Sequence, residues 1–246
     1  MSVVFTRRAA SARILAVSAA AAAAAVAAGC ATQGSVPDIF ASREPMAASR
    51  DEIWFVYLET GKTGFADRAA QEAMQRGHIA NFQRLFGEKK LFAAGPLKDP
   101  SEFKRGIVVV KAPSLQVLAE YFQPDQYVRE GYLKLDAVPA LVNKPLATEG
   151  IDSSAIEEGR IVQLLRPERA PAPAEAQAQR AAIRRLVEQG TFGAWYTLEA
   201  GPVSEVLFTR SKDDKALWAA VGALPPAGGP AKADVWPQWF ARGVLK

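Results

Sequence analysis

The sequence is poor in metal-binding and redox-active side chains: among 246 residues there is one cysteine, Cys30, and one histidine, His78. A single cysteine excludes an internal disulfide. With one histidine, a metal ion would depend on carboxylate ligands alone. We therefore expect this protein to have no metal and no cofactor.

Common nucleotide-binding and hydrolase motifs are missing as well. The segment ETGKTG follows an apolar run, but the P-loop spacing requires a glycine where Val56 stands, so GKT is interpreted as a turn. Neither G-x-S-x-G nor G-x-G-x-x-G occurs in the sequence. The sequence gives no support for a P-loop, a nucleophile elbow or a dinucleotide site.

The first 29 residues resemble a bacterial lipoprotein signal peptide. Arg7, Arg8 and Arg13 precede a mostly alanine stretch that ends in VAAGC, with small residues directly before Cys30. The resemblance implies cleavage before Cys30 and acylation of that residue, which would anchor the protein to a lipid bilayer of the cell envelope. Ala31 in place of aspartate indicates the outer membrane, facing the periplasm. An uncleaved anchor and a plain secretory signal are the alternatives.

Removing this segment changes the charge balance. Three of the 30 basic residues and no acidic residue lie in it, so 27 basic residues remain against 26 acidic ones. A nearly balanced chain gives no indication of a nucleic-acid partner. Residues 30–50 lack periodicity and are rich in Ser, Ala and Pro, which predicts a flexible tether.

Residues 51–145 have the βαββαβ order of a ferredoxin-like domain. A long helix is predicted over residues 66–87, because apolar positions and His78 recur on one helical stripe. A short helix is predicted in SLQVLAEYF, with Ser114 as its N-cap. The four expected strands are EIWFVYLET, KLFAAGPL (ending in a Gly-Pro turn), RGIVVVKAP and YLKLDAVPA.

Residues 146–246 repeat this order, which indicates a duplicated and degenerate second domain. Leu85 aligns with Leu186 and Leu118 with Trp218, at offsets of 101 and 100 residues. Helices are expected in APAPAEAQAQRAAIRRLVEQ and KDDKALWAAV. Strands are expected in RIVQLLRP, TFGAWYTL, EVLFTR and ADVWPQWFA, the last an edge strand because of its proline.

The first strand predicts how the two halves combine. Its residues are apolar on both faces, with Phe55 and Tyr57 on one side and Trp54 and Val56 on the other. Such a strand needs covering on both faces, and the helices of one half cover only one. We therefore predict an α+β fold in which two ferredoxin-like halves form an intramolecular dimeric α/β barrel.

Two segments of the first half resemble the YCII-related family. HIANFQRLFGEKKLFAAGPL and PDQYVREGYLKLDAVP carry a helical histidine, a strand ending in Ala-Gly-Pro, and an Asp-x-aromatic-Val-x-x-Gly segment. Members of this family are ferredoxin-like domains that pair into a dimeric α/β barrel, and their relatives include muconolactone-isomerase-like enzymes. The resemblance implies a cleft bearing a histidine and a carboxylate. The second half shares only the element order, with Gln179 where His78 would align.

The resemblance makes His78 and Asp125 the candidate catalytic residues. On its position alone, His78 lies on the apolar helical stripe and could equally be a packing residue. As a base it would need a carboxylate to orient its ring. Asp125 matches the acidic position of the family, and Asp99 and Glu59 are further candidates.

Two functional hypotheses remain open at this stage. The first is a non-catalytic module that binds a small organic ligand or an envelope protein, and the sequence slightly favours it. The second is a cofactor-free acid/base enzyme, an isomerase or lyase, that uses His78 with a carboxylate. A pocket beside His78 with a carboxylate within hydrogen-bond reach would favour the second hypothesis.

Overall fold

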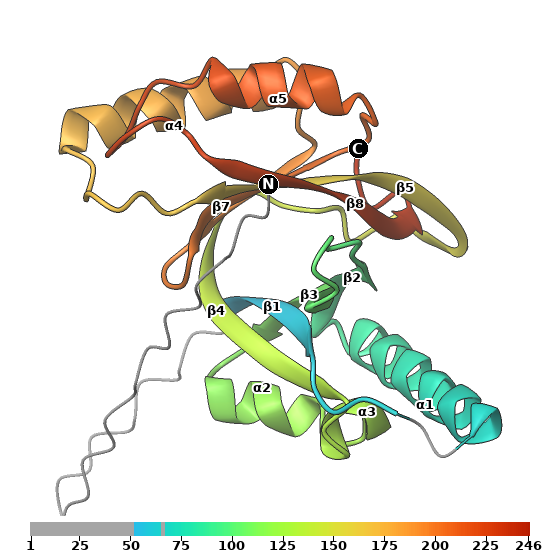
Figure 1. Ribbon diagram of the computed structural model, residues 1–246. Coiled ribbons are helices and arrows are strands. Elements are labelled where there is room, and N and C mark those ends of the chain that lie inside the picture. Colours follow the sequence, from blue (N-terminus) through green and yellow to red (C-terminus); the bar gives the residue numbers. More distant parts are fainter. Residues whose placement is uncertain (1–51, 65–66) are drawn as a thin grey trace, which may run out of the picture. The chain divides into compact units, whose positions relative to one another are not determined.

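The structure of this protein, a computed structural model, describes residues 52–64 and 67–246 (Figure 1). The expected signal peptide (1–29), Cys30 and its tether (30–50) lie outside the described residues. Contacts join the described residues into one compact unit. No helix in the described ranges combines the length and the hydropathy that a membrane span requires.

The first half has the predicted ferredoxin-like order, with one short additional helix. Asp67 caps the long helix by accepting a hydrogen bond from the Ala70 N–H, and Ser114 caps the next helix, as predicted, by accepting from the Val117 N–H. The elements are β1 (Glu52–Thr60), α1 (Arg68–Gly87), β2 (Leu91–Pro96), β3 (Lys104–Ala112), α2 (Leu115–Tyr121), α3 (Gln126–Arg129) and β4 (Leu133–Lys144).

The second half repeats this order, as predicted, and its first strand is much longer than expected. This strand extends before the predicted start at Arg160 because its first residues pair with the end of the last strand, for example Ile156 with Ala241. The elements are β5 (Asp152–Leu165), α4 (Pro173–Glu188), β6 (Ala194–Leu198), β7 (Val203–Thr209), α5 (Asp214–Gly222) and β8 (Ala233–Arg242).

All eight strands belong to one antiparallel sheet in the order β2-β3-β1-β4-β6-β7-β5-β8. Each half contributes four neighbouring strands, and β4 pairs with β6 where the halves join. At the other end β8 approaches β2 through the Leu97–Gln238 bridge and a hydrogen bond of 3.0 Å from the Lys98 N–H to the Pro237 carbonyl. We call this β2–β8 contact the closing seam. The sheet is therefore a nearly closed barrel, and β8 is the edge strand that its proline predicted.

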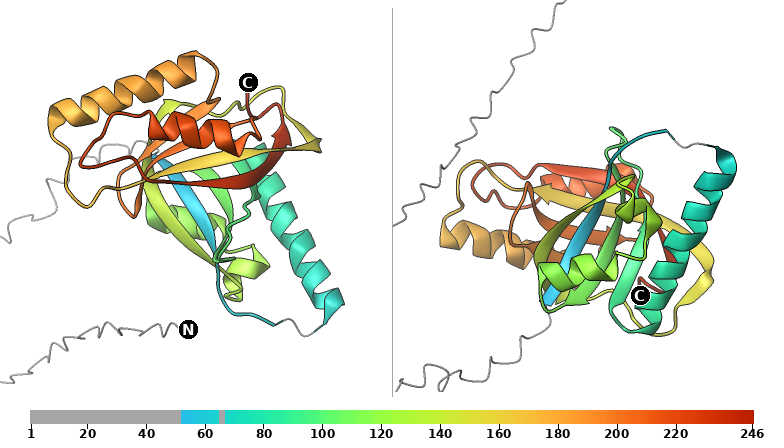
Figure 2. Two further views of the ribbon diagram at one scale, coloured as in Figure 1. Left: turned by 45° about the horizontal axis from the view of Figure 1, so that its top comes forward. Right: turned by 90° about the horizontal axis from the view of Figure 1, so that it is seen from below.

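The predicted burial of the two inner sheet faces against each other is confirmed. One apolar cluster fills the barrel and takes residues from both halves, with Phe55 near Tyr57, Tyr196 and Phe208. The helices lie outside the barrel, α1, α2 and α3 over the first half and α4 and α5 over the second (Figures 1 and 2). Each helical layer buries its own apolar cluster against the sheet. The α+β fold of two ferredoxin-like halves is the one that the sequence predicted.

Two local predictions were wrong. Gly95 and Pro96 do not form a turn, because they are the last two residues of β2. A Cβ atom on Gly95 would lie 1.8 Å from the Trp239 carbonyl oxygen, so the glycine permits the close approach of β8 at the closing seam. Trp218 is not the counterpart of buried Leu118, since it is exposed on α5, and the neighbouring Leu217 is the buried residue.

Candidate functional site

His78 lies on the buried face of α1, at the position that the helical stripe predicted. Its ring is 4.2 Å from the Phe82 ring and 5.5 Å from the Tyr127 ring, measured between centroids. The residue is only 8% exposed. Flanking aromatic rings of this kind restrict the orientation of the imidazole.

Asp125 lies beside His78, although 47 residues separate them in the sequence. The Asp125 side chain is fully buried and is the N-cap of α3, where Oδ1 accepts a hydrogen bond of 3.0 Å from the Tyr127 N–H. Its Oδ2 is 2.6 Å from His78 Nδ1. Because a carboxylate can only accept, His78 donates through Nδ1–H, and in a neutral imidazole the lone pair is then on Nε2. Within the described part of the chain, Nε2 has no hydrogen-bond partner.

His78 also forms part of the wall of a pocket of about 560 Å³, which we call the α1 pocket. The pocket lies between α1 and the adjoining ends of β1, β2 and β3. Apolar lining comes from Leu58, Ile79 and Phe82, and positive charge from Lys62 and Arg105. The Lys62 ammonium group is 4.2 Å from the centroid of the Tyr132 ring, which also lines the pocket. The site therefore combines a paired imidazole with apolar surface and cationic groups.

One residue of the second half contributes to this pocket. Ile156, on the extended first part of β5, lines the α1 pocket and is 62% exposed. It could not be placed from the sequence, because DSSAIEEG has no strand-like alternation of apolar residues. Both halves of the chain therefore form the wall of the site.

The two other carboxylates considered from the sequence have different partners. Asp99 accepts hydrogen bonds from Ser101 and from the Lys104 N–H. Burial alone would raise the pKa of Asp99, but these hydrogen bonds lower it below its usual value. Glu59 lies at the end of β1, where burial and nearby Asp136 raise its pKa. Neither residue is hydrogen-bonded to His78.

The second half has a corresponding pocket, which we call the α4 pocket. It measures about 840 Å³ and lies between α4 and the ends of β5, β6 and β7. Gln179, which the alignment placed opposite His78, lines it and donates a hydrogen bond of 3.1 Å to the Pro225 carbonyl. The pocket of this half is therefore lined by Gln179 and by no imidazole.

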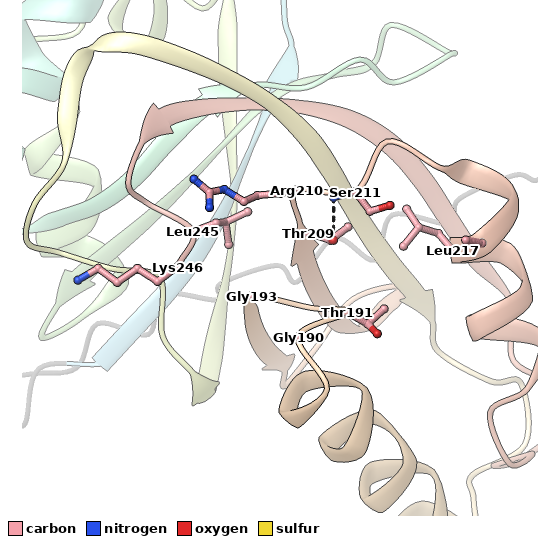
Figure 3. A pocket seen from close by; sticks show the side chains of 10 residues that line it. Gly190, Thr191, Gly193, Thr209, Arg210, Ser211, Leu217, Leu245 and Lys246 are labelled. Carbon is pink, nitrogen blue, oxygen red and sulfur yellow. Dashed lines mark hydrogen bonds between the residues drawn. The ribbon is translucent and has the colours of Figure 1, made fainter.

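A smaller cavity of about 310 Å³ lies near the end of β7 (Figure 3). The Ser211 N–H donates a hydrogen bond of 3.0 Å to Thr209 Oγ1 in its wall. Arg210, another lining residue, pairs with Glu157 at 3.3 Å. These polar groups already have partners within the fold.

A polar contact links the halves inside the barrel. Tyr57 donates a hydrogen bond of 2.7 Å from its hydroxyl group to Gln163 Oε1. Burial raises the pKa of Tyr57, so the phenol stays a donor at neutral pH. The Lys104 ammonium group lies 3.7 Å from the centroid of the Tyr57 ring, and burial lowers its pKa. This contact joins β1 to β5 across the barrel interior.

No group of three or more His, Cys, Asp or Glu side chains within residues 52–64 and 67–246 is arranged to hold a metal ion.

Comparisons with known proteins give structural similarity only. No model of a known protein family matches the chain, and no curated protein matches it. The chain is similar to a candidate monooxygenase from Fusobacterium nucleatum, with 9% identity over 81% of this chain and 98% of that one, at a TM-score of 0.49. It is also similar to a heme-binding protein from Thermus thermophilus, with 12% identity over 78% and 93% of the two chains, at a TM-score of 0.45. At these identities and TM-scores, neither similarity assigns an activity to this chain.

The strand order itself defines the structural class. Two four-stranded ferredoxin-like sheets join edge to edge, and helices cover the outside of each. This is the dimeric α/β-barrel architecture, formed here within a single chain.

Proposed function

We propose that this protein is a YCII-like module that binds a small organic molecule in the α1 pocket, and that His78 exchanges a proton with that molecule. The observation that supports the proposal is the contact of 2.6 Å between His78 Nδ1 and Asp125 Oδ2 in the pocket wall. A non-catalytic module was slightly favoured from the sequence alone. The paired imidazole beside a pocket now favours acid/base chemistry.

The geometry suggests a division of roles. Asp125 is a positioning residue, since it accepts the Nδ1–H bond and leaves Nε2 as the basic atom. Nε2 would remove a proton from a carbon next to a carbonyl group and return it to the opposite face of that carbon or to a neighbouring carbon, which is isomerisation. Lys62 and Arg105 would balance the negative charge that the substrate carries after the proton has left. No cofactor takes part in this scheme.

His78→Gln is expected to abolish proton exchange. Small carbonyl compounds that raise the melting temperature of the full-length protein would be incubated with it in D₂O, and deuterium incorporation would be followed by NMR. Because glutamine has no basic nitrogen, the catalysed exchange should fall by at least about a hundredfold, the typical contribution of a general base. The melting temperature of the variant should stay close to that of the native protein.

Two matched variants sharpen this test. Asp125→Asn removes the carboxylate that orients the ring, so exchange should be slower and its pH profile should shift. Gln75→Ala changes another lining residue of α1 and should alter affinity without abolishing exchange. Unchanged exchange in His78→Gln would contradict the proposed role of the imidazole.

A second candidate is a binding module without catalysis. The ring of His78 is nearly enclosed by Phe82 and Tyr127, which is also the setting of a packing residue. In that case no ligand that binds would exchange protons, and His78→Gln would lower the melting temperature rather than a reaction rate. The same pair of measurements therefore separates the two candidates.

We also propose that the protein is a lipoprotein of the cell envelope, anchored to the outer membrane through acylated Cys30 and facing the periplasm. The small residues before Cys30 and the basic start of the sequence support this. Cells that express the full chain should incorporate labelled palmitate into it, and globomycin should block its processing. The Cys30→Ser variant should take up no label, and an unlabelled native protein would contradict the proposal.

A further inference from the structure

The α4 pocket carries an excess of positive charge. Four basic residues line it, and only two acidic residues, Glu168 and Glu205, oppose them. The basic residues are Arg166, Arg180, Arg184 and Lys232. A pocket lined mainly by one sign of charge attracts small ions of the opposite sign.

Three of these cations, Arg166, Arg184 and Lys232, form no ion pair within the described residues. Arg166 donates its hydrogen bonds to the carbonyl oxygens of Leu198, Gly201 and Val203, which are neutral groups. These bonds fix the guanidinium group, and its charge acts on Glu205 without forming an ion pair with it. Arg184 makes no hydrogen bond or ion pair within the described part of the chain.

Arg180 is only loosely paired. Its Nε lies 3.7 Å from Glu205 Oε1, and its side chain is 45% exposed. Arg180 and Arg184 are four residues apart on α4, so their like charges face the same side of the helix and repel each other. An anion between the two guanidinium groups would remove this repulsion and could accept bidentate hydrogen bonds.

Glu205, an acidic residue in the lining of the pocket, already has partners within the fold. The Glu205 side chain is buried, and its Oε2 accepts hydrogen bonds of 2.7 Å from both Trp195 Nε1 and Thr197 Oγ1. Burial raises the pKa of Glu205 above its usual value, so this carboxyl group takes up a proton more readily than an ordinary glutamate. Leu164, Leu198 and Ala181 supply apolar lining next to these charges.

We propose that the α4 pocket is a second ligand site, which binds a small organic anion: its carboxylate lies between Arg180 and Arg184, and its apolar part lies against the sheet. The site is distinct from the α1 pocket and does not depend on the function proposed for His78. The second half of the barrel therefore has a binding role of its own, different from that of the first half.

The probe for this proposal is 3-phenylpropionate, which combines one carboxylate with a compact apolar body. Its neutral isostere 3-phenylpropionamide serves as the matched ligand. Titration calorimetry on the full-length protein should show binding of the acid and, because the charge is missing, binding of the amide that is at least about tenfold weaker. Arg184→Gln should weaken binding of the acid by a similar factor without affecting folding, since Arg184 has no partner within the described chain.

Two control variants locate the site. Arg185→Gln removes the same charge from α4 at a residue that does not line the pocket, and Arg105→Gln removes a charge from the α1 pocket. Both should keep the native affinity for 3-phenylpropionate. The proposal is overturned if the native protein binds no acid, if acid and amide bind equally well, or if Arg105→Gln rather than Arg184→Gln weakens binding.

Discussion

Replacing Phe55 by alanine is expected to lower the free energy of unfolding by about 3–5 kcal/mol, the usual cost of removing a fully buried phenylalanine. Phe55 has no exposed surface, and its ring lies 6.3 Å from both Tyr196 and Phe208, which belong to the second half. The loss should therefore destabilise both halves together. Urea unfolding monitored by tryptophan fluorescence provides the measurement.

The positions of the tryptophans make this measurement informative. Trp54 is the only one of the five tryptophans in the first half, so the fluorescence signal comes mainly from the second half. A lower urea midpoint in Phe55→Ala would thus report coupling through the barrel interior. Phe103→Ala, in the same half but at a 49% exposed residue, should change stability by no more than about 0.5 kcal/mol. If the urea midpoint measured by tryptophan fluorescence were the same in Phe55→Ala as in the native protein, the two halves would unfold independently.

Gly95→Ala is expected to open the closing seam. The added methyl group would lie 1.8 Å from the Trp239 carbonyl oxygen and 2.8 Å from Gln238 Nε2, so β2 and β8 must separate. Forcing extra volume into a packed interface typically costs about 1–3 kcal/mol. The amide of Lys98, which donates to the Pro237 carbonyl across the seam, should exchange with deuterium faster than in the native protein.

Gly77→Ala is the matched control for the seam variant. Gly77 is also in the first half, on α1, and a Cβ atom there would meet nothing within 4 Å. Alanine within a helix is more favourable than glycine, so stability should rise by about 0.5–1 kcal/mol. Two results would show that the closing seam is not a tight contact: a Gly95→Ala variant as stable as Gly77→Ala, and a Lys98 amide that exchanges with deuterium as slowly as in the native protein.

The barrel could be predicted because its physical cause is local. A strand that is apolar on both faces, such as β1, cannot be covered on both by the helices of one half. The repeated element order supplies a second sheet that covers the other face. The stripe of apolar residues and His78 on α1 could also be predicted, because the helical period determines which side chains share a face. Such features depend on the residues of one element at a time.

Contacts between distant elements were harder to predict. Asp125 was selected through a family resemblance, since no local pattern connects it with His78 across the intervening chain. Glu205 was not singled out at all, because its role depends on the pocket that α4 forms over β7. Gly95 was interpreted as part of a turn, since its sequence does not reveal the close approach of Trp239. In each case the decisive neighbour comes from another part of the fold.

The covalent link between β4 and β5 has an evolutionary consequence. In a barrel assembled from two identical subunits, every mutation appears twice, so the two clefts must change together. Here each cleft is encoded by its own part of the sequence, so the two can differ, with His78 in the wall of one and Gln179 in the wall of the other. A barrel formed within one chain can therefore have two unlike pockets.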